Sequence, residues 1–127
     1  ERNDWRDPFL YQHADGTWRM LLCARVHEGP RDRRGTFGLA TSPDMEHWTV
    51  QPPILTPGTT NAPECPDLFI ESGDPYLVYA SYSDRFATRY RWAPSPDGPW
   101  SLPVDDALEA PDVYAMKTAG DGERRGR

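Results

Sequence analysis

Short runs in which apolar and polar residues alternate dominate the chain, and no segment carries a long helical period. The stretches "DPFLYQHADGTWRMLLCA" from Asp7 and "DLFIESGDPYLVYASY" from Asp67 each contain two such runs around a turn, "HADGT" and "ESGDP". Alternating runs that flank a short turn predict a β-hairpin. Prolines interrupt most windows that could form a helix. We therefore expect an all-β chain in which hairpins begin near these two aspartates.

A third strand and a characteristic turn are expected after each hairpin. The stretches "GTFGLATS" at 35–42 and "TRYRWAPS" at 88–95 supply the strands, and the turns "SPDMEHW" and "SPDGPW" follow, ending at Trp48 and Trp100. An Asp after Ser-Pro favours a tight turn, and the following Trp is expected to pack over the sheet edge. The segments "TVQPPIL" and "SLPVDDAL" then predict short outer strands.

This repeated unit of four strands indicates the blade of a β-propeller. A third copy begins at Asp112 with "DVYAMKTAGDGERR", so the repeats start 60 and 45 positions apart, a difference that loops of unequal length explain. Because a propeller closes with about 4 to 8 blades, we expect residues 1–127 to be one partial propeller domain of two to three blades. The first blade and the last blades are expected to lie outside it. A β-sandwich of short strands is the alternative fold.

Composition narrows the functional classes. Pro 14 and Gly 10 in 127 residues supply many turns, and the net charge of −6 disfavours nucleic-acid binding, which needs a basic surface. No apolar run reaches membrane-spanning length, and the three histidines lack the short spacing of a zinc site. We expect neither a metal nor another cofactor. Cys23 and Cys65 are too few for a disulfide scaffold, so free thiols are favoured.

The chain begins with Glu1 rather than Met, so its natural start is expected to lie upstream. Localisation therefore stays open between cytoplasmic and secreted, and the sequence also leaves the oligomeric state undetermined. Open blade edges would favour self-association, because an exposed strand edge can pair with another chain.

Two carboxylates have the spacing expected of a site at one end of a propeller channel. Asp7 and Asp67 begin equivalent repeats, and Glu64, between Pro63 and Cys65, lies three residues before the second. The innermost strands of neighbouring blades line the channel, so Asp7 and Glu64, 57 positions apart, are expected to approach each other. Converging carboxyl groups are equipped for glycoside hydrolysis, in which one carboxylic acid protonates the leaving oxygen. The alternative is that they only cap strand ends.

The motifs "WRDP" at 5–8 and "ECPDLF" at 64–69 resemble, in this order, the Arg-Asp-Pro and Glu-Cys motifs of glycoside hydrolase family 32. That family of invertases, inulinases and levanases is related to families 43 and 68. The resemblance implies a five-bladed propeller that hydrolyses β-fructosidic bonds of sucrose or fructans with retention of configuration and without a metal. The expected partner is accordingly a carbohydrate of the fructoside class.

The resemblance also implies roles for individual residues. Asp7 would stabilise the transition state by holding fructosyl hydroxyls, and Arg6 would bind sugar hydroxyls and keep Asp7 ionised. Glu64 would be the general acid and then the general base. Cys65 would pack beside Glu64 and help to bind substrate, although a small buried apolar residue is an equally good interpretation. Trp5 is a candidate sugar-stacking platform or a core residue.

The nucleophile of the family, an Asp in an Asn-Asp-Pro-type motif of the first blade, has no counterpart in this chain. Asn3 and Asp4 are followed by Trp5 and lie too close to Asp7 to belong to a preceding blade. The chain by itself is therefore expected to be inactive, even if the protein that carries it is an enzyme. Two alternatives stay open: a family 43-like arabinosidase, and an inactive propeller that binds carbohydrate or acts as a scaffold. Asp67 is expected to be structural.

Overall fold

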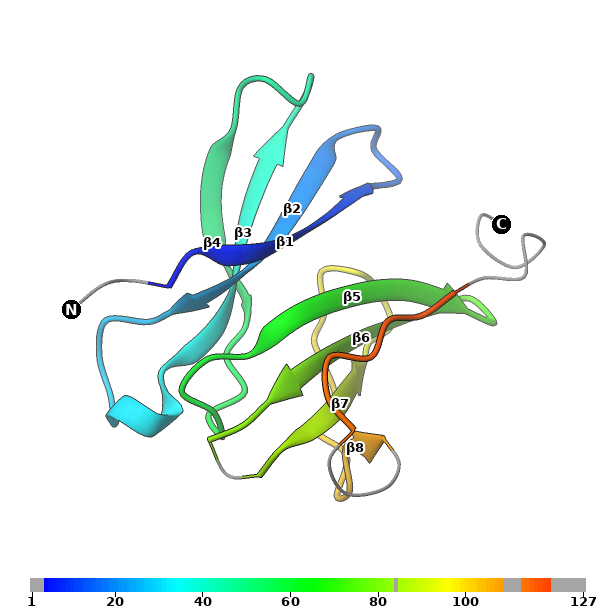
Figure 1. Ribbon diagram of the computed structural model, residues 1–127. Coiled ribbons are helices and arrows are strands. Elements are labelled where there is room, and N and C mark those ends of the chain that lie inside the picture. Colours follow the sequence, from blue (N-terminus) through cyan, green and yellow to red (C-terminus); the bar gives the residue numbers. More distant parts are fainter. Residues whose placement is uncertain (1–3, 84, 109–112, 120–127) are drawn as a thin grey trace.

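The computed structural model describes residues 4–83, 85–108 and 113–119, which form two four-stranded antiparallel sheets (Figure 1). The first sheet contains β1 (Arg6–Gln12), β2 (Trp18–Arg25), β3 (Gly35–Ser42) and β4 (Thr49–Leu55). The second contains β5 (Glu64–Glu71), β6 (Asp74–Ser81), β7 (Ala87–Trp92) and β8 (Ala107–Leu108). A short 3-10 turn, η1 (Arg31–Arg33), precedes β3. No helix among the described residues is long and apolar enough to span a bilayer.

Each sheet is a simple meander, because strands that are consecutive in sequence are neighbours in space. The first strands of the two sheets, β1 and β5, contact each other and run side by side where the sheets meet (Figure 1). A sandwich would instead place the two sheets face to face over their whole area. The structure therefore confirms the predicted architecture of two neighbouring propeller blades, each with its first strand innermost.

The strand boundaries match the prediction closely in the first blade and less closely in the second. The segment "TVQPPIL" forms β4, an edge strand, where prolines are tolerated. Strand β7 ends at Trp92 rather than at residue 95, because Pro94 has no N–H with which to continue the ladder. Only the last two residues of "SLPVDDAL" form a strand. Asp112, the expected start of a third blade, lies outside the described residues, and 113–119 form no strand.

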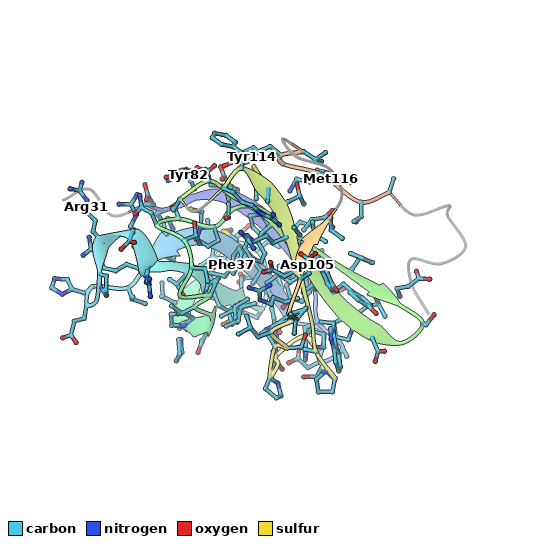
Figure 2. All side chains as sticks on the ribbon, turned by 90° about the horizontal axis from the view of Figure 1, so that it is seen from below. Arg31, Phe37, Tyr82, Asp105, Tyr114 and Met116 are labelled. Atoms are coloured by element: carbon cyan, nitrogen blue, oxygen red, sulfur yellow. The ribbon has the colours of Figure 1, made fainter. Side chains whose placement is uncertain are left out.

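The hydrophobic core lies between the two blades and draws on both of them. Phe37 of β3 and Tyr79 of β6 meet edge to face, with ring centroids 5.1 Å apart, which is a favoured geometry for aromatic pairs. In Figure 2 Phe37 lies in the middle of the molecule. The other buried members come equally from the two sheets: Leu21, Leu39, Leu68 and Leu77. This shared core fixes the starts of β1 and β5 relative to each other.

A β-bulge occurs near the start of both innermost strands. Its position shows that the predicted alignment of the two repeats was wrong. The pairing of β1 with β2 shifts between Arg6 and Phe9, and the pairing of β5 with β6 shifts between Glu64 and Asp67. The second residue of each strand has positive φ, 55° at Asp7 in β1 and 52° at Cys65 in β5. Asp7 is therefore equivalent to Cys65, not to Asp67 as the sequence pattern indicated. Arg6 is equivalent to Glu64.

A buried ion cluster holds the outer part of the second blade together. Asp106, just before β8, accepts hydrogen bonds from Arg89 through one carboxylate oxygen and from Arg91 through the other. Arg91 also lies 5.4 Å from the centre of the Tyr79 ring, a distance that allows a cation–π contact. All three charged side chains are almost fully buried, so each needs its partners to offset the loss of hydration.

Candidate active site

Arg6, the first residue of β1, is the centre of the candidate site because its guanidinium contacts three carboxylates. Nη1 lies 2.5 Å from Asp4, Nε lies 3.8 Å from Asp7, and Nη2 donates a hydrogen bond to Oε1 of Glu64. Partial burial alone lowers the pKa of Arg6, but the hydrogen bond to Glu64 and the surrounding negative charges outweigh it, so this pKa is raised. The guanidinium therefore stays charged between these carboxylates.

Asp7 and Glu64 thus lie together, as the spacing of the two motifs predicted. They come from the starts of two adjacent strands of different blades, and one guanidinium touches both carboxylates. Both side chains are partly exposed to solvent.

Asp4 has a supporting position and does not replace the missing nucleophile motif. One of its oxygens pairs with Arg6, and the other lies 2.5 Å from Nε of Arg25 in β2. With both oxygens occupied by guanidinium groups, Asp4 holds Arg6 in place rather than offering a free oxygen to a substrate. Within the described residues, moreover, no group of three or more His, Cys, Asp or Glu side chains is arranged to hold a metal ion.

Tyr114 is a second partner of Glu64 that the sequence analysis missed. Its hydroxyl donates a hydrogen bond to Oε2, the oxygen of Glu64 that Arg6 does not contact. Burial raises the pKa of Tyr114, and the hydrogen bond to Glu64 raises it further, so the phenol keeps its proton. The residue after Tyr114, Ala115, has a positive φ of 56°. Arg6 and Glu64 are likewise each followed by a residue with positive φ, so Tyr114 occupies the same position in its repeat. The repeat signal would have found Tyr114 had the repeats been aligned on this position.

Asp7 is held by the backbone of the neighbouring blade. The N–H of Cys65 donates to Oδ2 of Asp7 at 3.2 Å, and the Cys65 sulfur lies 3.9 Å from the same oxygen. Burial and the negative charge of Asp7 raise the pKa of the Cys65 thiol, so it stays neutral. Both cysteines are free thiols, as predicted. Cys65 therefore positions Asp7 chiefly through its backbone, in addition to packing beside Glu64.

Residues 113–119 are attached to the start of β5 by hydrogen bonds from Lys117 and Thr118. Nζ of Lys117 donates to the carbonyl oxygens of Cys65 and Pro66 at 3.0 and 2.8 Å. Thr118 donates through its N–H and its hydroxyl to Oδ2 of Asp67 at 2.5 and 2.8 Å. The buried carboxylate of Asp67 is thus used to attach this segment, which matches the structural role expected for it. Sequence reasoning did not single out Lys117 or Thr118.

Trp5 is partly packed against the first blade and partly exposed. Its ring packs over Gly38 of β3 so closely that a Cβ on Gly38 would lie 2.8 Å from the ring. Even so, 52% of Trp5 is exposed. One edge of the indole is therefore fixed against the first blade, while the rest is open beside Arg6.

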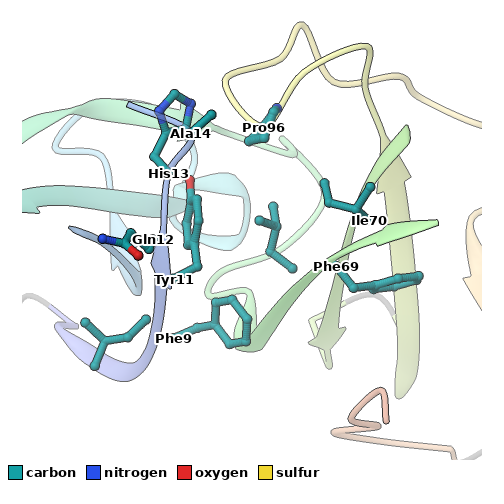
Figure 3. Close-up of a pocket in the computed structure, with 10 residues that line it drawn as sticks. Phe9, Tyr11, Gln12, His13, Ala14, Phe69, Ile70 and Pro96 are labelled. Carbon is teal, nitrogen blue, oxygen red and sulfur yellow. The ribbon is translucent and has the colours of Figure 1, made fainter. Parts of the chain in front are cut away.

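A pocket of about 630 Å³ opens at the other end of the innermost strands (Figure 3). Its walls come from the later residues of β1 and β5, and none of Arg6, Asp7 and Glu64 lines it. The lining is mainly apolar and includes Phe9, Tyr11, His13, Leu68, Phe69 and Ile70. The candidate site is thus a small polar cluster at the strand starts rather than the large cavity.

Comparison with known families agrees with the two motifs. Residues 1–100 match the family model described as "Glycosyl hydrolases family 32 N-terminal domain". This match covers well over half of the 127 residues. The chain belongs to glycosyl hydrolase family 32. In this family 32 chain, the Arg-Asp-Pro and Glu-Cys motifs are the residues that meet at Arg6.

Solved structures with the same fold include several glycoside hydrolases. An inulosucrase from Halalkalicoccus jeotgali bound to kestose is 20% identical, with a TM-score of 0.66 over 79% of this chain and 30% of the other. The family 43 β-xylosidase/α-arabinofuranosidase CoXyl43, from a compost microbial metagenome, is 17% identical, with a TM-score of 0.60 over 83% and 36%. The family 117 hydrolase Zg3597 of Zobellia galactanivorans is 17% identical, with a TM-score of 0.63 over 98% and 43%. The family 32 chain spans less than half of each relative.

Proposed function

We propose that this chain forms part of the active site of a β-fructofuranosidase-type hydrolase that cleaves sucrose or fructans with retention of configuration. The observation that carries the proposal is the single Arg6 guanidinium that holds Asp7 and Glu64 side by side. Family 32 membership and the order of the two motifs support the fructoside class. The whole protein's substrate would accordingly be a carbohydrate bound at the starts of the innermost strands.

In this proposal Glu64 supplies the proton that the leaving oxygen takes up as the glycosidic C–O bond breaks. Its carboxyl group is oriented from two sides, by Arg6 at Oε1 and by Tyr114 at Oε2. Such two-sided support leaves one lone pair on each carboxyl oxygen, and the proton that Glu64 delivers is carried on one of these two positions. After the first product leaves, the same carboxylate accepts a proton from the attacking water.

Asp7 has a different task, because it is held by donors and stays close to a permanent positive charge. The N–H of Cys65 and the Nε of Arg6 both face Oδ2, which leaves Oδ1 open to hydroxyl groups of the sugar. A carboxylate fixed in this way stabilises positive charge that develops on the sugar ring. A retaining mechanism also needs a carboxylate nucleophile, so the proposal requires that another part of the propeller provide it.

A substrate panel tests this proposal with the full-length protein. We expect hydrolysis of sucrose, kestose or inulin and none of xylotriose or arabinan. We also expect Asp7→Asn to lower kcat/KM on the best fructoside by about 10²- to 10³-fold. A control variant, Asp74→Asn, removes an exposed carboxylate from the distal start of β6 and is expected to keep full activity.

Three outcomes would contradict the fructosidase assignment. Cleavage of arabinan or xylotriose without cleavage of fructosides would favour a family 43-like activity. Carbohydrate binding without turnover of any substrate would favour a binding propeller. Full activity of Asp7→Asn would remove Asp7 from the mechanism.

A further inference from the structure

The position of the proposed acid defines which side of the site receives the leaving group. A general acid must reach the glycosidic oxygen, so its carboxyl group faces the bond between the sugar that is retained and the sugar that departs. In the proposed function, Arg6 and Asp7 hold the sugar that is retained. Residues beyond Glu64, on the side of Tyr114, are therefore next to the departing sugar.

An exposed aromatic ring lies on that side. Phe86, in the loop just before β7, is 60% exposed, and its ring centroid is 5.2 Å from that of Tyr114. The two rings are tilted by 51°, and the hydroxyl of Tyr114 reaches Glu64. Phe86 is thus separated from the proposed acid by one aromatic side chain.

Further aromatic surface adjoins this pair. Tyr82 is a further aromatic residue near Tyr114, and Figure 2 shows the two tyrosines near each other along one edge of the molecule. Trp5, by contrast, is packed on Gly38 of the first blade beside Arg6. The carboxylates therefore have an aromatic residue on each side, Trp5 beside Arg6 and Phe86 beside Tyr114.

We propose that Phe86, backed by Tyr114, is the platform on which the departing sugar ring stacks, an inference that rests on the proposed function. Carbohydrate rings present apolar C–H faces, and aromatic side chains combine a flat apolar surface with few rotatable bonds. The platform selects substrates whose leaving group is itself a sugar, as in sucrose or a fructan, over fructosides with a small leaving group. Phe86 is a specificity residue and takes no part in proton transfer.

The test compares two substrates in the full-length protein. Sucrose has a sugar as its leaving group, whereas β-fructofuranosyl fluoride releases only fluoride and has no ring to stack. Phe86→Ala is expected to lower kcat/KM for sucrose about tenfold, the loss of one aromatic stacking contact, and to leave kcat/KM for the fluoride unchanged. Phe86→Trp is expected to restore the value for sucrose. Val50→Ala, which trims an exposed apolar residue on the outer strand of the first blade, is expected to change neither.

The remaining outcomes separate failure of the platform from failure of the proposed function. If Phe86→Ala lowers both values equally, Phe86 has only a structural role and the inference is overturned. An unchanged value for sucrose overturns it as well. If the unmodified protein turns over neither fructoside, the proposed function fails and this inference falls with it.

Discussion

At their starts β1 and β5 present charged side chains to each other, whereas the later residues of the same two strands enclose an apolar pocket. Arg6, Asp7 and Glu64 meet at the strand starts, the polar end. Phe9 and Leu68 are among the residues that line the pocket at the opposite, apolar end (Figure 3). The strands, their order and their neighbours are the same at both ends. The difference between the polar end and the apolar end must therefore be set by a few residues within each strand.

The bulges explain that difference. After the bulges, β1 and β5 pair regularly with β2 and β6, and alternate side chains point into the core between the blades. At the bulge one extra residue with positive φ interrupts the alternation, so neighbouring side chains are directed to the strand start instead of into the core. Left-handed backbone at a non-glycine residue costs about 1 kcal/mol or more. Asp7 and Cys65 both adopt it, and they hydrogen-bond to each other.

Among the residues that support Glu64 and Asp7, the largest expected effect comes from removing Arg6, whose charge organises the polar end. Arg6→Ala leaves Asp4, Asp7 and Glu64 without their shared guanidinium, and we expect kcat/KM for sucrose to fall about 10²- to 10³-fold. Arg6→Lys is expected to lower kcat/KM almost as much, because an ammonium cannot donate to three carboxylates at the spacing of a guanidinium. Near-normal rates in both variants would show that the polar end does not depend on Arg6.

The apolar end should respond in stability rather than in rate. Leu68→Ala removes a buried side chain shared by the core and the pocket, and we expect the free energy of unfolding to fall by about 2–5 kcal/mol. At a temperature where the variant is folded, kcat/KM is expected to be unchanged. Leu10→Ala, on a more exposed wall of the same pocket, is the control and should cost far less. Denaturant unfolding measures the stability and initial rates measure kcat/KM. A large loss of rate without a loss of stability would contradict the assignment of catalysis to the polar end and stability to the apolar end.

A smaller effect is expected from the second support of Glu64. Tyr114→Phe removes only the hydroxyl that donates to Oε2, and we expect kcat/KM for sucrose to fall about tenfold, as for the loss of one hydrogen bond. Tyr76→Phe makes the same change at the other end of the molecule, where Tyr76 stacks on Phe69, and should leave the rate unchanged. Equal rates for Tyr114→Phe and the unmodified protein would show that Arg6 alone orients Glu64.

The smallest effect concerns the pH dependence of stability. Cys23 of β2 lies under the polar end, and burial raises the pKa of its thiol from 9.0 to about 12. Because the folded protein binds this proton more tightly than the unfolded chain, the contribution to stability is present below pH 9.0 and is lost as pH rises towards 12. Thermal unfolding should therefore show Tm falling more steeply above pH 9 in the unmodified protein than in Cys23→Ala. Parallel curves would contradict the prediction.

Much of the fold could be predicted because short apolar runs flank turns that have recognisable residues. The hairpins of β1–β2 and β5–β6 and the edge strand β4 follow from such local signals. The extent of β7 and β8 did not, since prolines and the buried pairing of Asp106 with two arginines decide it. Those contacts depend on packing that a local pattern does not encode.

The candidate site shows the same division. Arg6, Asp7, Glu64 and Cys65 could be located because their two short motifs are specific. The equivalence of Asp7 with Cys65 could not, because an extra residue in a bulge leaves no mark in a repeat aligned on aspartates. Tyr114 was missed for the same reason, and Phe86 because a single exposed aromatic residue is common on protein surfaces.

The most direct test of the central claim is the effect of Glu64→Gln on two substrates of the full-length protein. Sucrose needs a proton on its leaving oxygen, whereas fluoride departs from β-fructofuranosyl fluoride without one. If Glu64 is the general acid, kcat/KM for sucrose falls about 10²- to 10⁴-fold while kcat/KM for the fluoride is largely kept. If both values are lost equally, or if neither changes, Glu64 is not the proton donor and the account of the polar end is wrong.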